Sequence, residues 1–137
     1  MTPWPLSVAF PLTLLASIAI VLVFDVLSAM AAARHPDFPY RKLWPVQLAL
    51  YAVIGFCAMF ALLDLRRVEA VGAITAFVEW TLGWAIVWRI GPGRVENATP
   101  GRIIVAVLSM TAFGFGFALL GALIFNVAVT LMLRAHS

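Results

Sequence analysis

Residues 6–33 read LSVAFPLTLLASIAIVLVFDVLSAMAAA, and this apolar run decides the class of fold. A helix rises ~1.5 Å per residue, so ~20 apolar residues cross the ~30 Å hydrocarbon core of a bilayer. The run is longer than that and contains a single charged residue, Asp25. It therefore predicts a membrane-spanning helix with an acidic side chain inside it.

Further apolar runs of sufficient length follow along the chain, over about residues 43–63, 68–90 and 103–133. The last of them is long enough to require tilt or to extend into water. Loops rich in proline and charge, residues 34–45 and 91–101, lie between the outer pairs of runs, and residues 64–69 form a tight turn between the middle pair. We predict an all-α membrane protein, with residues 1–137 forming one domain that is a four-transmembrane-helix bundle.

The composition excludes a soluble protein. Hydrophobic residues make up 64% of the 137 residues, charged residues make up 11%, and the mean hydropathy is +1.06. A soluble domain of this size has too large a surface for its volume to bury so much apolar area. The chain is basic, but its Lys and Arg residues stand at the expected helix ends, which is typical of membrane anchoring. We therefore expect a lipid bilayer as the partner, and no nucleic acid.

The distribution of basic residues predicts the orientation. Six Lys and Arg residues lie at the first and third loops, and three lie at the middle turn and C-terminus. The positive-inside rule then places both termini on the non-cytoplasmic side. The first apolar run is too long for the core of a signal peptide, so we expect it to remain as a helix. Short loops and the lack of a presequence favour a multi-pass protein of a bacterial inner membrane.

Two carboxylates lie deep inside the predicted helices. Asp25 precedes Arg34 by nine residues, and Glu79 precedes Arg89 by ten. At ~1.5 Å per residue, each carboxylate lies ~13–15 Å below the interface that its arginine marks, close to the bilayer midplane. An ionisable group at that depth costs several kcal/mol unless it is paired, hydrated or protonated. Both residues are therefore candidates for a functional role.

The other two helices offer polar groups at the same depth. Tyr51 follows Lys42 by nine residues, and Thr111 follows Arg102 by nine. Each of the four polar residues shares a helical face with small residues, which permit close helix packing in lipid. The small residues on these faces include Ala29, Gly55, Gly72, Ala76, Gly83, Gly114, Ala118 and Gly121. We predict that Asp25, Tyr51, Glu79 and Thr111 point into one shared interior.

The functional hypothesis is a binding and transport site for protons or a cation. Burial and a neighbouring like charge both disfavour two ionised carboxylates, so Asp25 and Glu79 can exchange a proton for a cation. Tyr51 and Thr111 would supply hydrogen bonds. Two other interpretations stay open: the acids bond across helices and only hold the bundle in register, or they pair with basic groups of another subunit.

No pattern of catalytic residues is visible, and we predict no cofactor and no metal site. The single cysteine, Cys57, excludes an intramolecular disulfide and a CxxC site. The two histidines, His35 and His136, lie in a loop and at the C-terminus, which argues against haem ligation within the membrane.

The chain is thus more readily a transporter or channel subunit than an enzyme. The alternative is a non-catalytic accessory or assembly subunit of a larger membrane complex. Because four helices enclose little volume, we expect a homo-oligomer or a place in such a complex.

Overall fold

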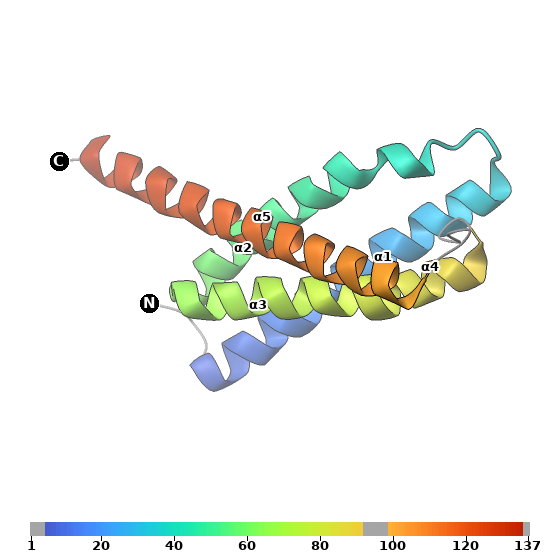
Figure 1. Ribbon diagram of the computed structural model, residues 1–137. Helices are drawn as coiled ribbons and strands as arrows, with labels where there is room; N and C mark the ends of the chain where they lie inside the picture. The colour runs from blue at the N-terminus through green and yellow to red at the C-terminus, as the bar shows by residue number, and fades with distance from the viewer. Residues whose placement is uncertain (1–4, 92–98, 136–137) are drawn as a thin grey trace.

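The protein is described by a computed structural model that covers residues 5–91 and 99–135 (Figure 1). In chain order the elements are α1 (Leu6–Arg34), a 3₁₀ turn η1 (Tyr40–Lys42), α2 (Trp44–Leu62), α3 (Leu65–Val78), a π turn η2 (Glu79–Gly83), α4 (Trp84–Ile90) and α5 (Pro100–Ala135). Helix α3, the turn η2 and α4 follow one another without a break and form one long helix, residues 65–90. The described part of the chain is all-helical and has no strands, and four of its helices are long and apolar enough to cross a membrane, as predicted.

The turn between α2 and α3 is shorter than predicted. It consists of Leu63, which has the left-handed φ of 51°, and Asp64, whose side chain accepts a hydrogen bond of 3.0 Å from the backbone N–H of Arg66. This bond satisfies one of the N–H groups that a helix start leaves without a partner. Helix α3 therefore begins at Leu65, and Arg66 and Arg67 lie in its first turn instead of in the connecting turn.

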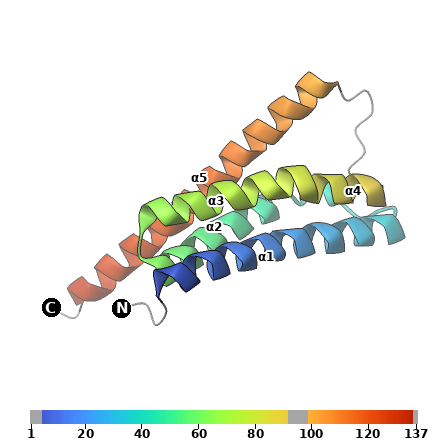
Figure 2. The same cartoon turned by 90° about the horizontal axis from the view of Figure 1, so that it is seen from below.

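Helix α5 crosses the other helices at an angle (Figures 1 and 2). It packs mainly against α2 and α3, whereas α1 packs against α2, α3 and α4. With 36 residues at ~1.5 Å each, α5 is ~54 Å long and exceeds the ~30 Å hydrocarbon core. Its first turns diverge from α4, as Figure 2 shows. The four helices are thus in contact over only part of the length of α5.

Small residues form the crossing of α5 with α2 and α3. A Cβ atom added at Gly72 would lie 2.7 Å from the Cβ of Ala118, and one added at Gly114 would lie 2.7 Å from the Cβ of Ala76. On the α2 side, a Cβ at Gly55 would collide with the carbonyl group of Ala118. Such close backbone approach is how helices gain contact area when lipid removes the hydrophobic drive between them. The predicted small-residue faces of α3 and α5 are confirmed as packed faces.

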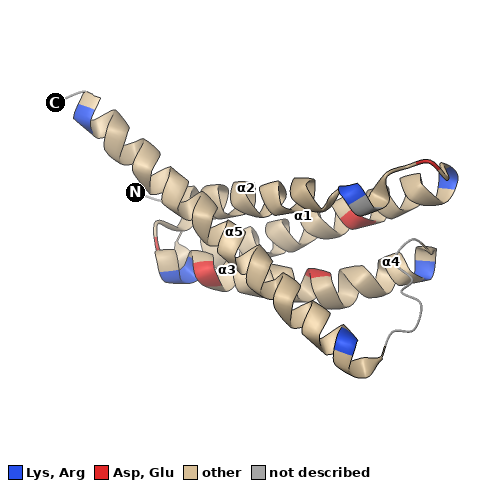
Figure 3. Cartoon of the chain, turned by 45° about the horizontal axis from the view of Figure 1, so that its top comes forward, with Lys and Arg blue, Asp and Glu red and all other residues tan. Residues whose placement is uncertain are grey.

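Large apolar side chains cover the outside of the bundle. Leu27 is 62% exposed, Phe60 is 70% exposed and Leu108 is 62% exposed. Figure 3 shows that Lys and Arg gather near the helix ends. An apolar outer surface with charge confined to the ends matches a solvent of lipid chains between two aqueous layers. These helices therefore indicate a membrane protein.

Candidate functional site

Asp25 and Glu79 meet in one buried cluster that joins three helices. Their side chains are 6% and 2% exposed, respectively. The side-chain amide of Gln47 donates a hydrogen bond to Oε1 of Glu79 and one of 3.4 Å to Oδ1 of Asp25. The hydroxyl of Tyr51 donates to Oε2 of Glu79. Glu79 thus accepts two hydrogen bonds, and the amide of Gln47 connects it to Asp25.

Helical spacing brings these side chains to the same place. On α1, the buried residues Val21 and Asp25 are four apart, and Ser28 and Ala29 lie three and four residues after Asp25, so all of them form one face. On α2, Gln47 and Tyr51 are four residues apart, so both point toward the same neighbours. The two hydrogen bonds to Glu79 therefore come from successive turns of one helix.

The π turn η2 begins at Glu79 itself. Within it, the N–H of Trp84 bonds to the carbonyl of Glu79, five residues earlier, so this turn is wider than an α-helical turn. Before the turn, the buried residues of this helix recur at spacings of three and four. From the turn onward they are spaced four apart, at Glu79, Gly83 and Val87. The wider turn therefore keeps Gly83 on the side of the helix that faces the cluster. Turns of this kind are rare and often lie at functional sites.

Gly83 makes room for the carboxylate of Asp25. A Cβ atom added at this residue would lie 2.6 Å from Oδ2 of Asp25 and 3.5 Å from Cγ of Glu79. Both distances show that the two acids share a single space beside the glycine. A residue with a side chain at this position would push Asp25 away from η2.

On the outer side of the same turn, Thr81 satisfies backbone groups. Its hydroxyl donates to the carbonyl of Phe77 at 2.7 Å and approaches that of Val78 at 3.2 Å. Such bonds matter where lipid offers a carbonyl no other donor. The side chain is exposed, so this bond supports the wider turn without entering the cluster.

The cluster contains two carboxylates and only neutral donors. Within the described residues neither acid forms an ion pair, and the ion pair that is present joins Arg67 Nε to Asp64 Oδ2 at 3.1 Å, in the first turn of α3. An amide and a phenol stabilise negative charge through dipoles, but they do not neutralise it. Two full negative charges at one buried site therefore call for a proton or a cation.

Tyr40 marks the side of the cluster nearest to the first loop. It belongs to η1 and is half-buried. Burial, and then the charges of Asp25 and Glu79, raise the pKa of Tyr40 to about 12. Its phenol therefore stays protonated at neutral pH and can act as a hydrogen-bond donor between the loop and the acids. Sequence reasoning did not single out this residue, because it lies in a proline-rich loop.

Thr111 is placed differently from the other three predicted residues. The structure brings Asp25, Tyr51 and Glu79 together, but the hydroxyl oxygen of Thr111 is buried and forms no hydrogen bond within the described residues. Its position follows from the antiparallel packing of α3 and α5. The pairs Ala76–Gly114 and Gly72–Ala118, continued in the antiparallel sense, direct Thr111 toward η2, which α5 also contacts. No hydrogen bond joins Thr111 to Glu79.

Sequence reasoning missed the central role of Gln47. Gln47 lies three positions after the start of α2 and resembles an interfacial polar group, so it did not stand out as a candidate. The usable signal was its spacing of four from Tyr51, which fixes both side chains on one face. The reach of a Gln side chain to two acids on different helices becomes visible only in the packed structure.

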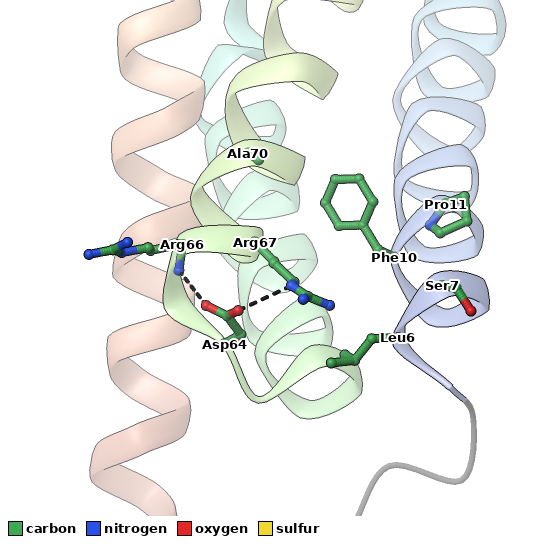
Figure 4. Close-up of a pocket in the computed structure, with 8 residues that line it drawn as sticks. All are labelled: Leu6, Ser7, Phe10, Pro11, Asp64, Arg66, Arg67 and Ala70. Atoms are coloured by element: carbon green, nitrogen blue, oxygen red, sulfur yellow. Dashed lines mark hydrogen bonds and ion pairs between the residues drawn. The ribbon is translucent and has the colours of Figure 1, made fainter.

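A pocket at the other end of the bundle is separate from this cluster (Figure 4). It has a volume of about 550 Å³, is open to the outside and lies between the first turns of α1 and α3. Its lining residues are Leu6, Ser7, Phe10, Pro11, Asp64, Arg66, Arg67 and Ala70. The charged groups in it belong to the capped start of α3, where Asp64 pairs with Arg67.

Comparison of the chain with protein-family models, curated proteins and solved structures found no match. The candidate site consequently depends on the geometry of the chain itself: two acids, one bridging amide and one phenol, all buried where α1, α2 and η2 meet.

Proposed function

We propose that this chain is a small membrane transport or channel subunit in which Asp25 and Glu79 bind protons or a cation. The observation that carries the proposal is the pair of buried carboxylates, linked by Gln47 and surrounded by neutral donors. A site of this kind gains stability when it holds one positive charge, and it loses that stability when the charge leaves. Alternate loading and release of that charge is the elementary step of ion-coupled transport.

In this proposal the residues have different roles. Asp25 and Glu79 carry the exchangeable charge. Tyr51 and Gln47 are positioning residues, because each donates a hydrogen bond that holds a carboxylate oxygen in place. Thr111 lines the same level of the interior from α5. Tyr40 connects the acids with the loop end, from which water reaches them.

The sidedness that we propose follows from the charges. Arg34, Lys42, Arg89 and Arg102 stand at the end of the bundle nearest the acids, and Arg66 and Arg67 stand at the opposite end. By the positive-inside rule, the end near the acids is cytoplasmic and both termini are on the other side of a bacterial inner membrane. Protons or cations would then enter the site from the cytoplasm, beside Tyr40.

We further infer that the working unit contains more than one chain. The first turns of α5 diverge from the rest of the bundle (Figure 2), and their apolar side chains Ile104, Val105 and Leu108 are 58%, 64% and 62% exposed. A second copy packed on this face would complete an enclosed pathway. The accessory-subunit alternative uses the same face for a different protein. Purification in mild detergent separates the two, because a discrete self-oligomer favours transport and stoichiometric foreign chains favour the accessory role.

Proton flux into liposomes tests the proposed site. We expect Asp25→Asn and Glu79→Gln each to reduce the flux roughly tenfold or more, since each removes one exchangeable charge from a buried site. The matched controls are Asp37→Asn in the first loop and Glu69→Gln near the start of α3, which remove carboxylates outside the cluster and should leave the flux unchanged. Size-exclusion profiles show whether each variant is folded. Wild-type flux in folded Asp25→Asn and Glu79→Gln proteins would overturn the proposal.

A further inference from the structure

Two threonines in the bundle leave their hydroxyl groups without hydrogen bonds. Four other hydroxyl side chains in these helices bond to the carbonyl four residues earlier: Thr13 to Ala9, Ser17 to Thr13, Thr81 to Phe77 and Thr130 to Asn126. The hydroxyl oxygens of Thr75 and Thr111 are buried but form no such bond, nor any other within the described residues. Thr75 is 0% exposed. A buried hydroxyl that forms no bond costs free energy, and in native proteins it commonly indicates a bound water or ion.

Both threonines lie near Glu79 along the bundle, with Thr75 about one helical turn away on its own helix. Thr75 precedes Glu79 by one helical turn on α3, so the two residues share a face. Thr111 lies toward η2, since Ala76 opposes Gly114 and Gly72 opposes Ala118 in the antiparallel packing of α3 and α5, and α5 also contacts η2. The α2 side agrees with this placement. Gly114, one turn after Thr111, lies against the ring of Tyr51, whose hydroxyl bonds to Glu79.

The oxygen atoms at this level have the chemistry of ligands for a hard cation. Carboxylate and hydroxyl oxygens are the donors that such ions prefer. A water molecule would satisfy the two hydroxyls but would not offset the charge of the carboxylate. A divalent ion takes six or more oxygens, usually from several carboxylates, whereas Glu79 is the carboxylate on the same helical face as Thr75. Asp25 comes from α1, lies against Gly83 in the same space and stays available for a proton.

We propose that Glu79, Thr75, Thr111 and the hydroxyl oxygen of Tyr51 bind one dehydrated monovalent alkali cation. This inference rests on the proposed function, because it names the cation that the carboxylate site carries. It also assigns different roles to the two acids: Glu79 binds the cation, and Asp25 binds the exchanged proton.

Equilibrium binding of radiolabelled Na⁺ to the purified full-length chain in detergent tests the site without any transport. We expect the wild-type protein to bind Na⁺, and Thr75→Val and Thr111→Val each to weaken the affinity roughly tenfold or more. The matched controls are Thr13→Val and Thr130→Val, whose hydroxyls bond to their own helix backbone away from the cluster and should leave binding unchanged. Thr111→Ser keeps the ligand oxygen and should keep the affinity.

The outcomes separate this inference from the proposed function. Absence of Na⁺ binding to the wild-type protein overturns the inference even if a valine variant fails to fold. Equal Na⁺ affinity in the wild type and in folded Thr75→Val and Thr111→Val overturns it as well. If either result occurs while proton flux still depends on Asp25 and Glu79, the proposed transport function holds, and the proton is its only ion. Conversely, Na⁺ binding that depends on the threonines, with flux that ignores both acids, supports the site and removes the transport function.

Discussion

At residue 83, the free space beside the helix backbone is filled by the carboxylate of Asp25. Alanine in place of glycine normally stabilises a helix by about 1 kcal/mol. At this position the added methyl group would meet Oδ2 of Asp25 at 2.6 Å and Cδ2 of Leu22 at 3.2 Å. We therefore expect Gly83→Ala to reduce the free energy of unfolding by about 1–3 kcal/mol, the usual cost of overpacking. Thermal unfolding in detergent, followed by circular dichroism, measures the change.

Gly116→Ala on α5 is the matched control for this substitution. Gly116 is exposed, and a Cβ atom added there meets no atom within 4 Å. The control should therefore be neutral or slightly stabilising. A Gly83→Ala protein that gains stability to the same extent would contradict the close approach of Asp25 to the π turn.

The candidate site was predictable at the residue scale only where a residue contrasts with its surroundings. Asp25 and Glu79 are conspicuous because a charge inside an apolar run is costly wherever the chain folds. Gln47 and Thr111 offer no such contrast. The role of Gln47 depends on a flexible side chain that reaches Asp25 on one helix and Glu79 on another, and the hydroxyl of Thr111 is notable only for the bond that it lacks. Both properties arise from packing between helices distant in sequence.

At the scale of elements, the helices were predictable and one of their turns was not. Length and apolar composition are enough to identify four spanning helices. The start of α3 was predicted three residues late because the charged residues near Arg66 resemble a loop, although Asp64 is a typical N-cap. The π turn gives no signal in the sequence, since residues 79–83 suit an ordinary helix. It depends on how Glu79 and Gly83 pack against α1 and α2.

Deletion of Leu82 tests what the π turn does. In a π turn each N–H bonds to the carbonyl five residues earlier, whereas in an α turn it bonds to the carbonyl four residues earlier. Loss of one residue therefore converts η2 into an α turn. Leu82 is 52% exposed, so its removal takes little from the core. We expect the variant to fold and give a single size-exclusion peak. We also expect it to keep proton flux, because Glu79 and Gly83, on the two sides of the deleted residue, keep their helical faces.

The control for this deletion is removal of Ile74, which is 40% exposed and lies inside the regular part of α3. There, loss of one residue turns everything that follows by about 100°, since an α-helix has 3.6 residues per turn. Glu79 would leave the interior, and the protein should aggregate or fail to purify. If both deletions behaved alike, η2 would have no special role in the helix.

At the scale of the whole molecule, the interior faces were predictable but the path of α5 was not. Small residues on α2, α3 and α5 indicate which sides pack. The crossing itself is set by contacts of Gly55 with Ala118 and of Gly121 with the carbonyl of Ala52, and these pairings follow from no periodicity. Because the crossing holds α5 along its middle, its first turns extend away from α4 (Figures 2 and 3). That divergence is the basis for expecting a second chain.

The orientation of the whole molecule gives the last prediction. Six Lys and Arg residues lie at the loops 34–45 and 91–101 or at their borders, and three lie at the opposite end. Insertion keeps the more basic end in the cytoplasm. We therefore expect alkaline phosphatase fused after Ser137 to be active and green fluorescent protein fused there to be dark.

Fusions of the same two reporters after Gly91 serve as the control, because this position follows α4 at the more basic end of the bundle. They should give the opposite pattern, with dark phosphatase and bright fluorescence. The reverse result at both positions would place the acids at the non-cytoplasmic end. Protons would then reach Asp25 from outside the cell, and the direction of exchange that we propose would be inverted while the site itself stayed the same. Equal signals from both reporters at each position would instead indicate that the charge bias of this chain is too small to choose one orientation.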